Sequence, residues 1–194
     1  MSLEERLPED SWRHIQGWMA PHACGIRLTR PRRTKLGDFR PARPGQPALI
    51  TLNSDLAPYQ LLLTLTHEIA HLETWPKRKR RTKPHGPEWR QRFGELLLEL
   101  AENPALDPRF REAVRRHSKS PKSSAMYDTA LFRTLRELEG STDTRLDSLK
   151  PGASFHFQGR AFTLEKTHRT RCLVRAHDNG ALYRIARLAS IEPV

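Results

Sequence analysis

The chain has 194 residues, of which 37% are hydrophobic and 29% are charged, and its formal net charge at pH 7 is +12. This length suits one ordinary domain, or a core domain with a small appendage. No run of about 18 apolar residues occurs, so the sequence contains no candidate membrane span. The excess of positive charge favours acidic partners, namely nucleic acid, anionic membrane surfaces or acidic proteins, although a merely basic surface has the same composition.

The two cysteines, Cys24 and Cys172, lie far apart and outside any Cys-x-x-Cys pair. This spacing argues against a disulfide framework and against a cysteine-based zinc ribbon. The first residues, MSLEERLPED, have neither the basic start nor the apolar middle of a signal peptide. We therefore expect a reducing, cytoplasmic setting.

The first third of the chain combines helical and extended segments. A short helix is expected from Ser11 to about Ala20, because Pro21 follows it. Residues 25–29 alternate loosely as in a strand, a Gly/Pro-rich turn region follows, and residues 48–52 (ALITL) are typical of a buried strand.

Residues 58–74 give the strongest helical pattern in the chain. The segment is apolar on nearly every side, which is typical of a helix buried within a domain. The polar exceptions fall at positions i, i+3, i+4 and i+7 and so share one face: Thr64, His67, Glu68 and His71. We expect this polar stripe to face a polar group or ligand and not the apolar core.

The rest of the chain predicts two more helices, a linker and a β-rich end. Helices are expected at 87–101 and 107–117, and residues 118–125 (SKSPKSSA) have the composition of a polar linker. Beyond a helix at about 128–138, short strand-like runs begin at Pro151, and Asp178-Asn179-Gly180 favours a hairpin turn. The expected organisation is a domain at 1–117, a polar linker with a short helix at 118–150, and a small barrel-like β module at 151–194.

The segment His67-Glu68-Ile69-Ala70-His71 is an HExxH motif on the expected buried helix. Two imidazoles four residues apart can bind one zinc ion, and the glutamate between them can take a proton from a zinc-bound water without binding the metal. A chance match, with histidines that merely pack, is the alternative. The polar stripe on an otherwise apolar helix favours the metal site.

A catalytic zinc needs a third protein ligand and one open position. His85 is the favoured third ligand, because it follows His71 across a basic segment and Gly86 beside it lets the backbone approach closely. Glu88 is the main rival, and three other acids lie in range: Glu73, Glu95 and Glu99. The remaining histidines are expected to be ordinary surface or packing residues: His14, His22, His117, His156, His168 and His177.

The combination TLTHEIAHLETW followed by HGPEWRQRF resembles the SprT-like zinc metallopeptidases, and KLGDFRP and ALITLN resemble the strand region that precedes the helix in that family. The resemblance covers about residues 25–100. It implies a zincin-like α+β core with the HExxH helix beside a small sheet, zinc ligands at His67, His71 and His85, and Glu68 as general base. Similarity to the Spartan proteases also implies association with DNA. Many relatives carry a cysteine zinc ribbon that this chain lacks.

The basic segment lies between two expected zinc ligands and hence at the rim of the expected cleft. It comprises Lys77, Arg78, Lys79, Arg80, Arg81 and Lys83. These side chains could hold nucleic acid or an acidic substrate near the metal, or could form a solvated loop whose charge only aids solubility. The basic residues after Pro151 leave the same choice open.

The sequence thus predicts a zinc metallopeptidase that hydrolyses peptide bonds in a protein or peptide substrate, with DNA-associated proteins as one substrate class. Tyr59 and Tyr127 are candidates for stabilising the oxyanion, although a structural role fits each better. The alternative is a basic nucleic-acid-binding protein with a structural or vestigial zinc site. Structural zinc usually has four protein ligands, and only three good ones are present.

Overall fold

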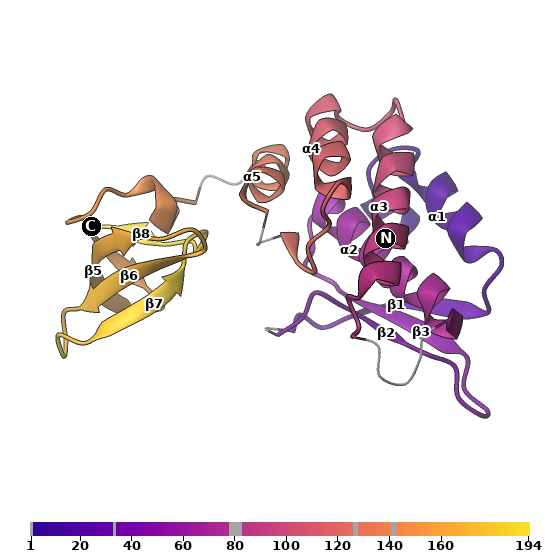
Figure 1. Cartoon of the computed structure of the whole chain (residues 1–194), viewed down its shortest axis with the longest axis horizontal. Coiled ribbons are helices and arrows are strands. Elements are labelled where there is room, and N and C mark those ends of the chain that lie inside the picture. Colours follow the sequence, from indigo (N-terminus) through magenta and orange to yellow (C-terminus); the bar gives the residue numbers. More distant parts are fainter. Residues whose placement is uncertain (1, 33, 78–82, 126–127, 141–142) are drawn as a thin grey trace. The chain divides into compact units, whose positions relative to one another are not determined.

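The computed structural model describes every residue except 1, 33, 78–82, 126–127 and 141–142. It is a mixed α+β structure with two compact units, Met1–Glu139 and Gly140–Val194 (Figure 1). Each unit buries its own cluster of apolar side chains. The first unit contains the HExxH helix and is described first.

A three-stranded sheet forms one layer of the first unit. Its strands are β1 (Cys24–Thr29), β2 (Gly37–Arg40) and β3 (Ala48–Asn53), in the order β1-β3-β2. The central strand β3 pairs in parallel with β1 and antiparallel with β2. Strand β2 lies within the segment KLGDFRP, where local composition predicts Gly/Pro-rich turns but the resemblance to the SprT-like family predicts a strand region, and it forms one edge of this sheet.

Five α-helices make up the rest of the unit: α1 (Ser11–Met19), α2 (Pro58–Thr74), α3 (Pro87–Glu102), α4 (Pro108–Ser118) and α5 (Thr129–Leu138). Proline occupies the first turn of α2, α3 and α4, where its missing N–H costs no helical hydrogen bond. Short 3₁₀ helices occur at η1 (Glu4–Arg6), η2 (Trp75–Lys77) and, in the second unit, η4 (Leu146–Ser148). None of the described helices combines the length and apolar character that crossing a bilayer requires.

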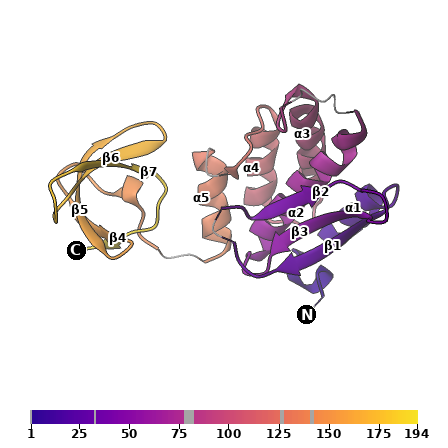
Figure 2. The same cartoon turned by 90° about the horizontal axis from the view of Figure 1, so that it is seen from below.

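Helix α2 lies between the sheet and the other helices (Figures 1 and 2). It contacts β2 and β3 on one side and α3 on another. Leu61, Leu62, Leu65 and Ile69 are fully buried, as expected for a helix that is apolar on nearly every side. One face of α2 therefore reaches the edge strand β2, and this contact positions the polar stripe.

Helix α5 belongs to the first unit. Its Leu131 and Leu135 are buried in the first core, and Asp128 caps the helix by accepting a hydrogen bond from the backbone N–H of Leu131 at 3.1 Å. The region expected to be a linker, 118–150, is thus divided between the two units, because the apolar face of α5 packs on the larger core and residues from Gly140 onward belong to the second unit.

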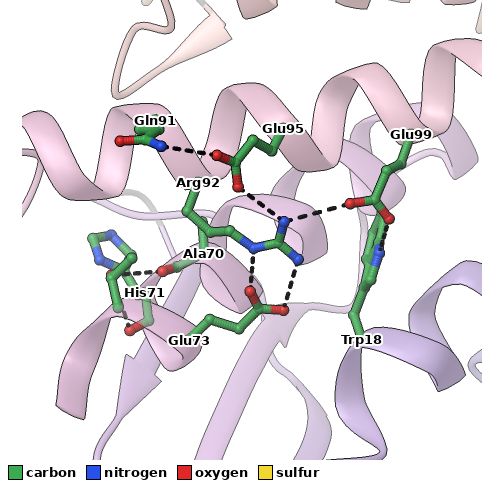
Figure 3. A network of polar contacts seen from close by, with 9 residues as sticks. Trp18, Ala70, His71, Glu73, Gln91, Arg92, Glu95 and Glu99 are labelled. Atoms are coloured by element: carbon green, nitrogen blue, oxygen red, sulfur yellow. Dashed lines mark hydrogen bonds and ion pairs between the residues drawn. The ribbon is translucent and has the colours of Figure 1, made fainter. Parts of the chain in front are cut away.

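A polar network around Arg92 joins three helices of the first unit (Figure 3). The guanidinium of Arg92 on α3 binds Glu73 on α2 through two nitrogens. It also donates to Glu95 at 3.1 Å and to Glu99 at 3.4 Å. Glu99 in turn accepts a hydrogen bond of 2.5 Å from the indole N–H of Trp18 on α1. Since Glu73 lies two residues after His71, this network fixes the end of α2 that carries the HExxH motif.

The Arg92→Met substitution is expected to lower the free energy of unfolding by about 1–3 kcal/mol, because it leaves the largely buried Glu73 carboxylate without its partner. Chemical denaturation measures the change. The exposed pair Arg109–Asp107 offers a control, because Arg109→Met should change stability little. A loss that persists unchanged when Glu73→Gln is combined with Arg92→Met would show that the ion pair is not its source.

The second unit is a five-stranded antiparallel sheet in the order β7-β6-β5-β4-β8. Its strands are β4 (Ser154–Phe157), β5 (Arg160–Thr167), β6 (Arg171–Ala176), β7 (Leu182–Ala186) and β8 (Glu192–Pro193). Residues 178–180 connect β6 and β7 as the expected hairpin, and Gly180 adopts a φ of +67°, which glycine tolerates best. The sheet buries its own apolar core, which includes Phe155, Phe162, Leu164 and Val174.

Candidate metal centre

Three histidines converge beside helix α2. His67 and His71 lie one turn apart on this helix, and His85 comes from the segment immediately before α3. Their Nε2 atoms form a nearly equilateral triangle, with separations of 3.2 Å for His67–His71, 3.1 Å for His71–His85 and 3.2 Å for His67–His85. Of the candidate ligands that the sequence offers, these three are the ones brought together.

The donor set fits a metal ion. Three nitrogens bound to one tetrahedral zinc at about 2.0–2.1 Å would lie about 3.4 Å apart, close to the separations found here. A neutral imidazole Nε2 either donates or accepts a hydrogen bond, so three that meet at one point cannot all satisfy each other. A cation that accepts all three lone pairs removes this conflict.

The environment also favours the neutral imidazoles that metal binding requires. Burial lowers the pKa of His67 well below its ordinary value, and the neighbouring His71 and His85 lower it further. Burial, followed by the charge of Arg90, likewise lowers the pKa of His85. Free nitrogen lone pairs are therefore available near neutral pH.

Aromatic side chains of α3 fix the orientation of the histidine rings. Trp89 is 2% exposed, and its ring centroid lies 4.6 Å from those of both His67 and His85. Its indole N–H donates a hydrogen bond of 3.4 Å to the backbone carbonyl of His67. Phe93 packs on His67 with a centroid distance of 5.5 Å. The helical spacing of Trp89 and Phe93 is that of core residues, and the structure shows that they also support the histidine cluster.

Glu68 is buried against the edge strand β2, with 6% of its surface exposed. The backbone N–H of Phe39 donates a hydrogen bond to its carboxylate. Burial, and then the charge of Asp38, raises the pKa of Glu68 to about 7, against the lowering effects of Phe39, Arg32 and Lys35. The carboxylate thus lies next to His67 in sequence, with a fixed orientation and a raised proton affinity.

Gly37 on β2 lies directly against the Glu68 side chain. A Cβ at this position would lie 2.6 Å from Oε1 of Glu68 and 2.8 Å from Cγ2 of Thr64. Only a residue without a side chain therefore lets β2 approach the carboxylate this closely. This contact between residues 31 positions apart could not be read from the sequence.

Gly37→Ala is expected to displace Glu68 or β2 and to lower the free energy of unfolding by about 1–3 kcal/mol, the usual cost of overpacking. Gly17→Ala is the matched control, because a Cβ at Gly17 on α1 would meet nothing within 4 Å. An alanine there should stabilise the helix by about 0.5–1 kcal/mol. Urea unfolding of both variants checks the pair, and equal effects of the two substitutions would contradict the close contact at Gly37.

A cleft of about 640 Å³ opens over the histidines and Glu68. One wall is formed by residues 34–39, which include strand β2. Another is formed by residues that follow α4, namely 122–125, together with Phe132 of α5. A volume of this size lies within the range of about 300–1,000 Å³ that is usual for ligand-binding clefts.

The rival acidic ligands are engaged elsewhere or lie outside the histidine cluster. Glu73, Glu95 and Glu99 all bind Arg92. Glu88 is exposed in the first turn of α3 and lines a small recess together with His71 and Lys83. The structure therefore offers His85, and not Glu88, as the third ligand atom near His67 and His71.

The basic segment is described only at its ends. Lys83 is exposed and lines the recess beside His71, while the backbone of Lys77 belongs to η2. Four of the expected nucleic-acid-binding residues lie outside the described residues: Arg78, Lys79, Arg80 and Arg81.

Of the two tyrosines considered as oxyanion donors, the structure describes Tyr59 but not Tyr127. The Tyr59 hydroxyl accepts a hydrogen bond of 3.1 Å from the backbone N–H of Asp107, and its ring packs on Phe110 with a centroid distance of 4.7 Å. Tyr59 thus has a structural role, as the sequence favoured. Tyr127 lies outside the described residues.

Among the six remaining histidines, His117 is the one that is buried. It is 2% exposed, and its Nδ1 lies 2.7 Å from Oδ2 of Asp128. By contrast, His156, His168 and His177 are exposed. The local sequence around His117 gives no sign of its partner, since Asp128 follows only after the polar segment.

Comparison with known proteins gives one match. Residues 13–103 match the model of the SprT-like family, and this range contains the sheet, α2, His85 and α3. Neither the curated proteins nor the solved structures provide a significant match to the chain. The expected family is thereby confirmed on the part of the chain that carries the histidine cluster. Residues 13–103, just under half of the chain, thus form a SprT-like region.

Proposed function

We propose that the protein is a zinc-dependent metallopeptidase with a zincin-like core, and that His67, His71 and His85 hold the zinc ion. The observation that carries this proposal is the triangle of three Nε2 atoms at 3.1–3.2 Å with the buried Glu68 beside it. Family membership supports the same class of enzyme. When bound, zinc polarises a carbonyl oxygen and lowers the pKa of water.

In this proposal Glu68 acts as the general base. Its carboxylate accepts a hydrogen bond from the Phe39 N–H, which orients it, and Gly37 leaves the space that it occupies. The carboxylate takes a proton from the attacking water and can return it to the leaving amine. Burial excludes bulk water from this carboxylate, so proton transfer to the substrate competes less with transfer to solvent.

The cleft fits an extended peptide as substrate. Strand β2 pairs with β3 on one side and, among the described strands, with no other. Its free edge carries backbone N–H and C=O groups along one wall of the cleft. An extended polypeptide can add to such an edge through main-chain hydrogen bonds, which would place a peptide bond over the histidines.

The first test is the zinc content of the purified protein, measured by elemental analysis, together with casein cleavage in the presence and absence of DNA. We expect one zinc per chain and cleavage that a chelator removes. A protein that takes up no zinc and leaves both casein and denatured protein intact would overturn the proposed function. Increased cleavage with DNA would assign DNA a role in substrate presentation.

A second candidate function is nucleic-acid binding, which the outer face of the β module supports. Residues alternate along β6, with Cys172 and Val174 buried and Arg171 and Leu173 on the outer face. Leu173 lies between Lys166 of β5 and Arg184 of β7 in the sheet register. Lys166, Arg171 and Arg184 are exposed, so three cations surround one apolar side chain.

The nearby acids of the same sheet pair with other arginines, Glu165 with Arg175 and Asp178 with Arg160. Among the described residues, none of the three cations forms an ion pair, although Arg171 donates a hydrogen bond of 3.4 Å to the Arg184 backbone carbonyl. We propose that they bind phosphate groups. Anisotropy of a labelled oligonucleotide tests this binding: it should weaken with salt and with Lys166, Arg171 and Arg184 replaced by glutamine. Salt-sensitive binding without cleavage of any protein, even with DNA present, would favour a binding protein over a peptidase.

A further inference from the structure

The cleft is completed by residues that lie outside the family match. The match ends at residue 103, whereas His117, residues 122–125 and Phe132 also line the cleft. These residues come from the end of α4, the segment after it, and α5. This wall is therefore a feature of this chain in addition to the SprT-like region, and its chemistry bears on which substrates the cleft accepts.

Buried polar contacts fix this wall in place. The Nδ1 atom of His117 pairs with Oδ2 of Asp128 at 2.7 Å, and its Nε2 atom accepts a hydrogen bond of 3.3 Å from the backbone N–H of Lys122. The second oxygen of Asp128 caps α5. One imidazole thus connects α4, the segment after it and the start of α5. Because both ring nitrogens are engaged, His117 contributes ring carbon to the cleft and no free polar atom.

The close approach of α3 and α4 supports the same wall. A Cβ at Gly94 on α3 would lie 2.9 Å from the carbonyl oxygen of Ser118, the last residue of α4. Pro121, which follows, is buried. The segment 122–125 therefore starts from a fixed point, and the cleft beside it has a defined shape.

Helix α2 supplies both polar and apolar side chains to the cleft. Its polar contributions are Gln60, Thr64, His67, Glu68 and His71, and Leu63 lies one helical turn before His67 on the same face, about 6 Å away along the axis. Helix α2 also contacts α5, and the apolar side chains of Phe93, Ala125 and Phe132 line the same cleft from α3, the segment after α4, and α5. Phe93 lies between the histidine cluster and this wall, because its ring lies 5.5 Å from that of His67 and 6.1 Å from that of His117.

We propose that Leu63, Phe93, Ala125 and Phe132 form a subsite that takes one large apolar side chain of the substrate, next to the bond that is cut. The proposal rests on the proposed function, because it assigns the specificity of that same cleft. A polypeptide in extended conformation along β2 would place alternate side chains about 7 Å apart. This spacing is close to the rise of about 6 Å between His67 and Leu63 along α2, so one side chain would enter the subsite when the backbone passes over the histidines. The class of substrate is then an unfolded polypeptide segment with a Phe, Leu or similar residue beside the scissile bond.

Binding to the zinc-loaded Glu68→Gln variant tests the subsite without turnover. The probes are a labelled Gly/Ser host peptide, the same peptide with one central Phe, and a third with Glu at that position. We expect the single Phe to tighten binding by about 10-fold or more, the usual gain from filling an apolar pocket. In the same background, Phe132→Ala and the space-filling Ala125→Trp should each remove most of this difference.

Leu138→Ala is the matched control, since Leu138 is a partly buried apolar residue of the same helix outside the cleft lining. The Leu138→Ala variant should keep the preference for the Phe peptide. Phe132→Leu, which keeps an apolar side chain at this position, should retain most of the preference that Phe132→Ala loses. Together these two variants separate loss of the subsite from loss of folding. Equal binding of all three peptides, stronger binding of the Glu peptide, or a preference that survives both cleft variants would overturn the subsite. Failure of the wild type to cut casein would overturn peptide hydrolysis and leave the binding result to judge the subsite.

Discussion

Replacement of Glu68 by glutamine is expected to reduce the rate of peptide hydrolysis by about 10²–10⁴-fold, the contribution that a general base usually makes. Glutamine has nearly the same shape and can still accept the hydrogen bond from the Phe39 N–H. It cannot take a proton from water at neutral pH. Because the three Nε2 atoms belong to other residues, the variant should keep its zinc.

The measurement is kcat/KM on a fluorogenic peptide together with the zinc content of the same sample. Glu102→Gln provides the matched control, because Glu102 is an exposed carboxylate at the end of α3 that pairs with Arg115. Its rate should stay close to that of the wild type. A Glu68→Gln enzyme of nearly normal activity would exclude the general-base role, and loss of zinc in that variant would show that the glutamate does more than accept a proton.

The helix and strand that the sequence predicted correctly around the candidate site follow from short-range order. The polar stripe on residues 58–74 follows from helical spacing alone, and α2 has the expected bounds. The buried strand at 48–52 was predicted for a similar reason, since a short apolar run identifies it. His85 needed more than spacing, because Glu88 is also in reach along the chain, and the resemblance to the SprT-like family favoured the histidine.

The parts that the sequence did not reveal depend on contacts between distant residues. Local composition gave only turn residues around strand β2, which the family resemblance placed in a strand region, and its contact with Glu68 through Gly37 arises only when β2 pairs with β3. Residues 118–125 have the composition of a polar linker and a helix was expected at about 128–138, but neither pattern shows that 122–125 and Phe132 line the cleft. Their position depends on His117 and Asp128, which face each other only after α4 and α5 have packed. Local composition therefore described the segment but not its place in the cleft.

Removal of the proposed third zinc ligand, His85, should have the second large effect, this time on zinc affinity. His85→Ala is expected to weaken zinc binding by more than about 100-fold, since even residues that only support metal ligands contribute about 10–100-fold. The remaining pair, His67 and His71, would hold the ion through two nitrogens of one helix. The loss should also appear in stability, because zinc at about 100 times its Kd stabilises the native protein by about 2.7 kcal/mol, and this gain disappears once the Kd exceeds the zinc concentration.

Competition with a zinc-binding dye gives the affinity, and thermal unfolding with and without zinc gives the stabilisation. His14→Ala is the control for loss of an imidazole, since His14 packs on Trp18 of α1. Glu88→Ala decides between the two candidate ligands that the sequence left open. If Glu88→Ala weakens zinc binding and His85→Ala does not, the segment before α3 must rearrange when the metal binds, and the histidine triangle would not be the metal site. If only His85→Ala weakens it, the three Nε2 atoms that lie 3.1–3.2 Å apart are those that hold the zinc, as the proposed function requires.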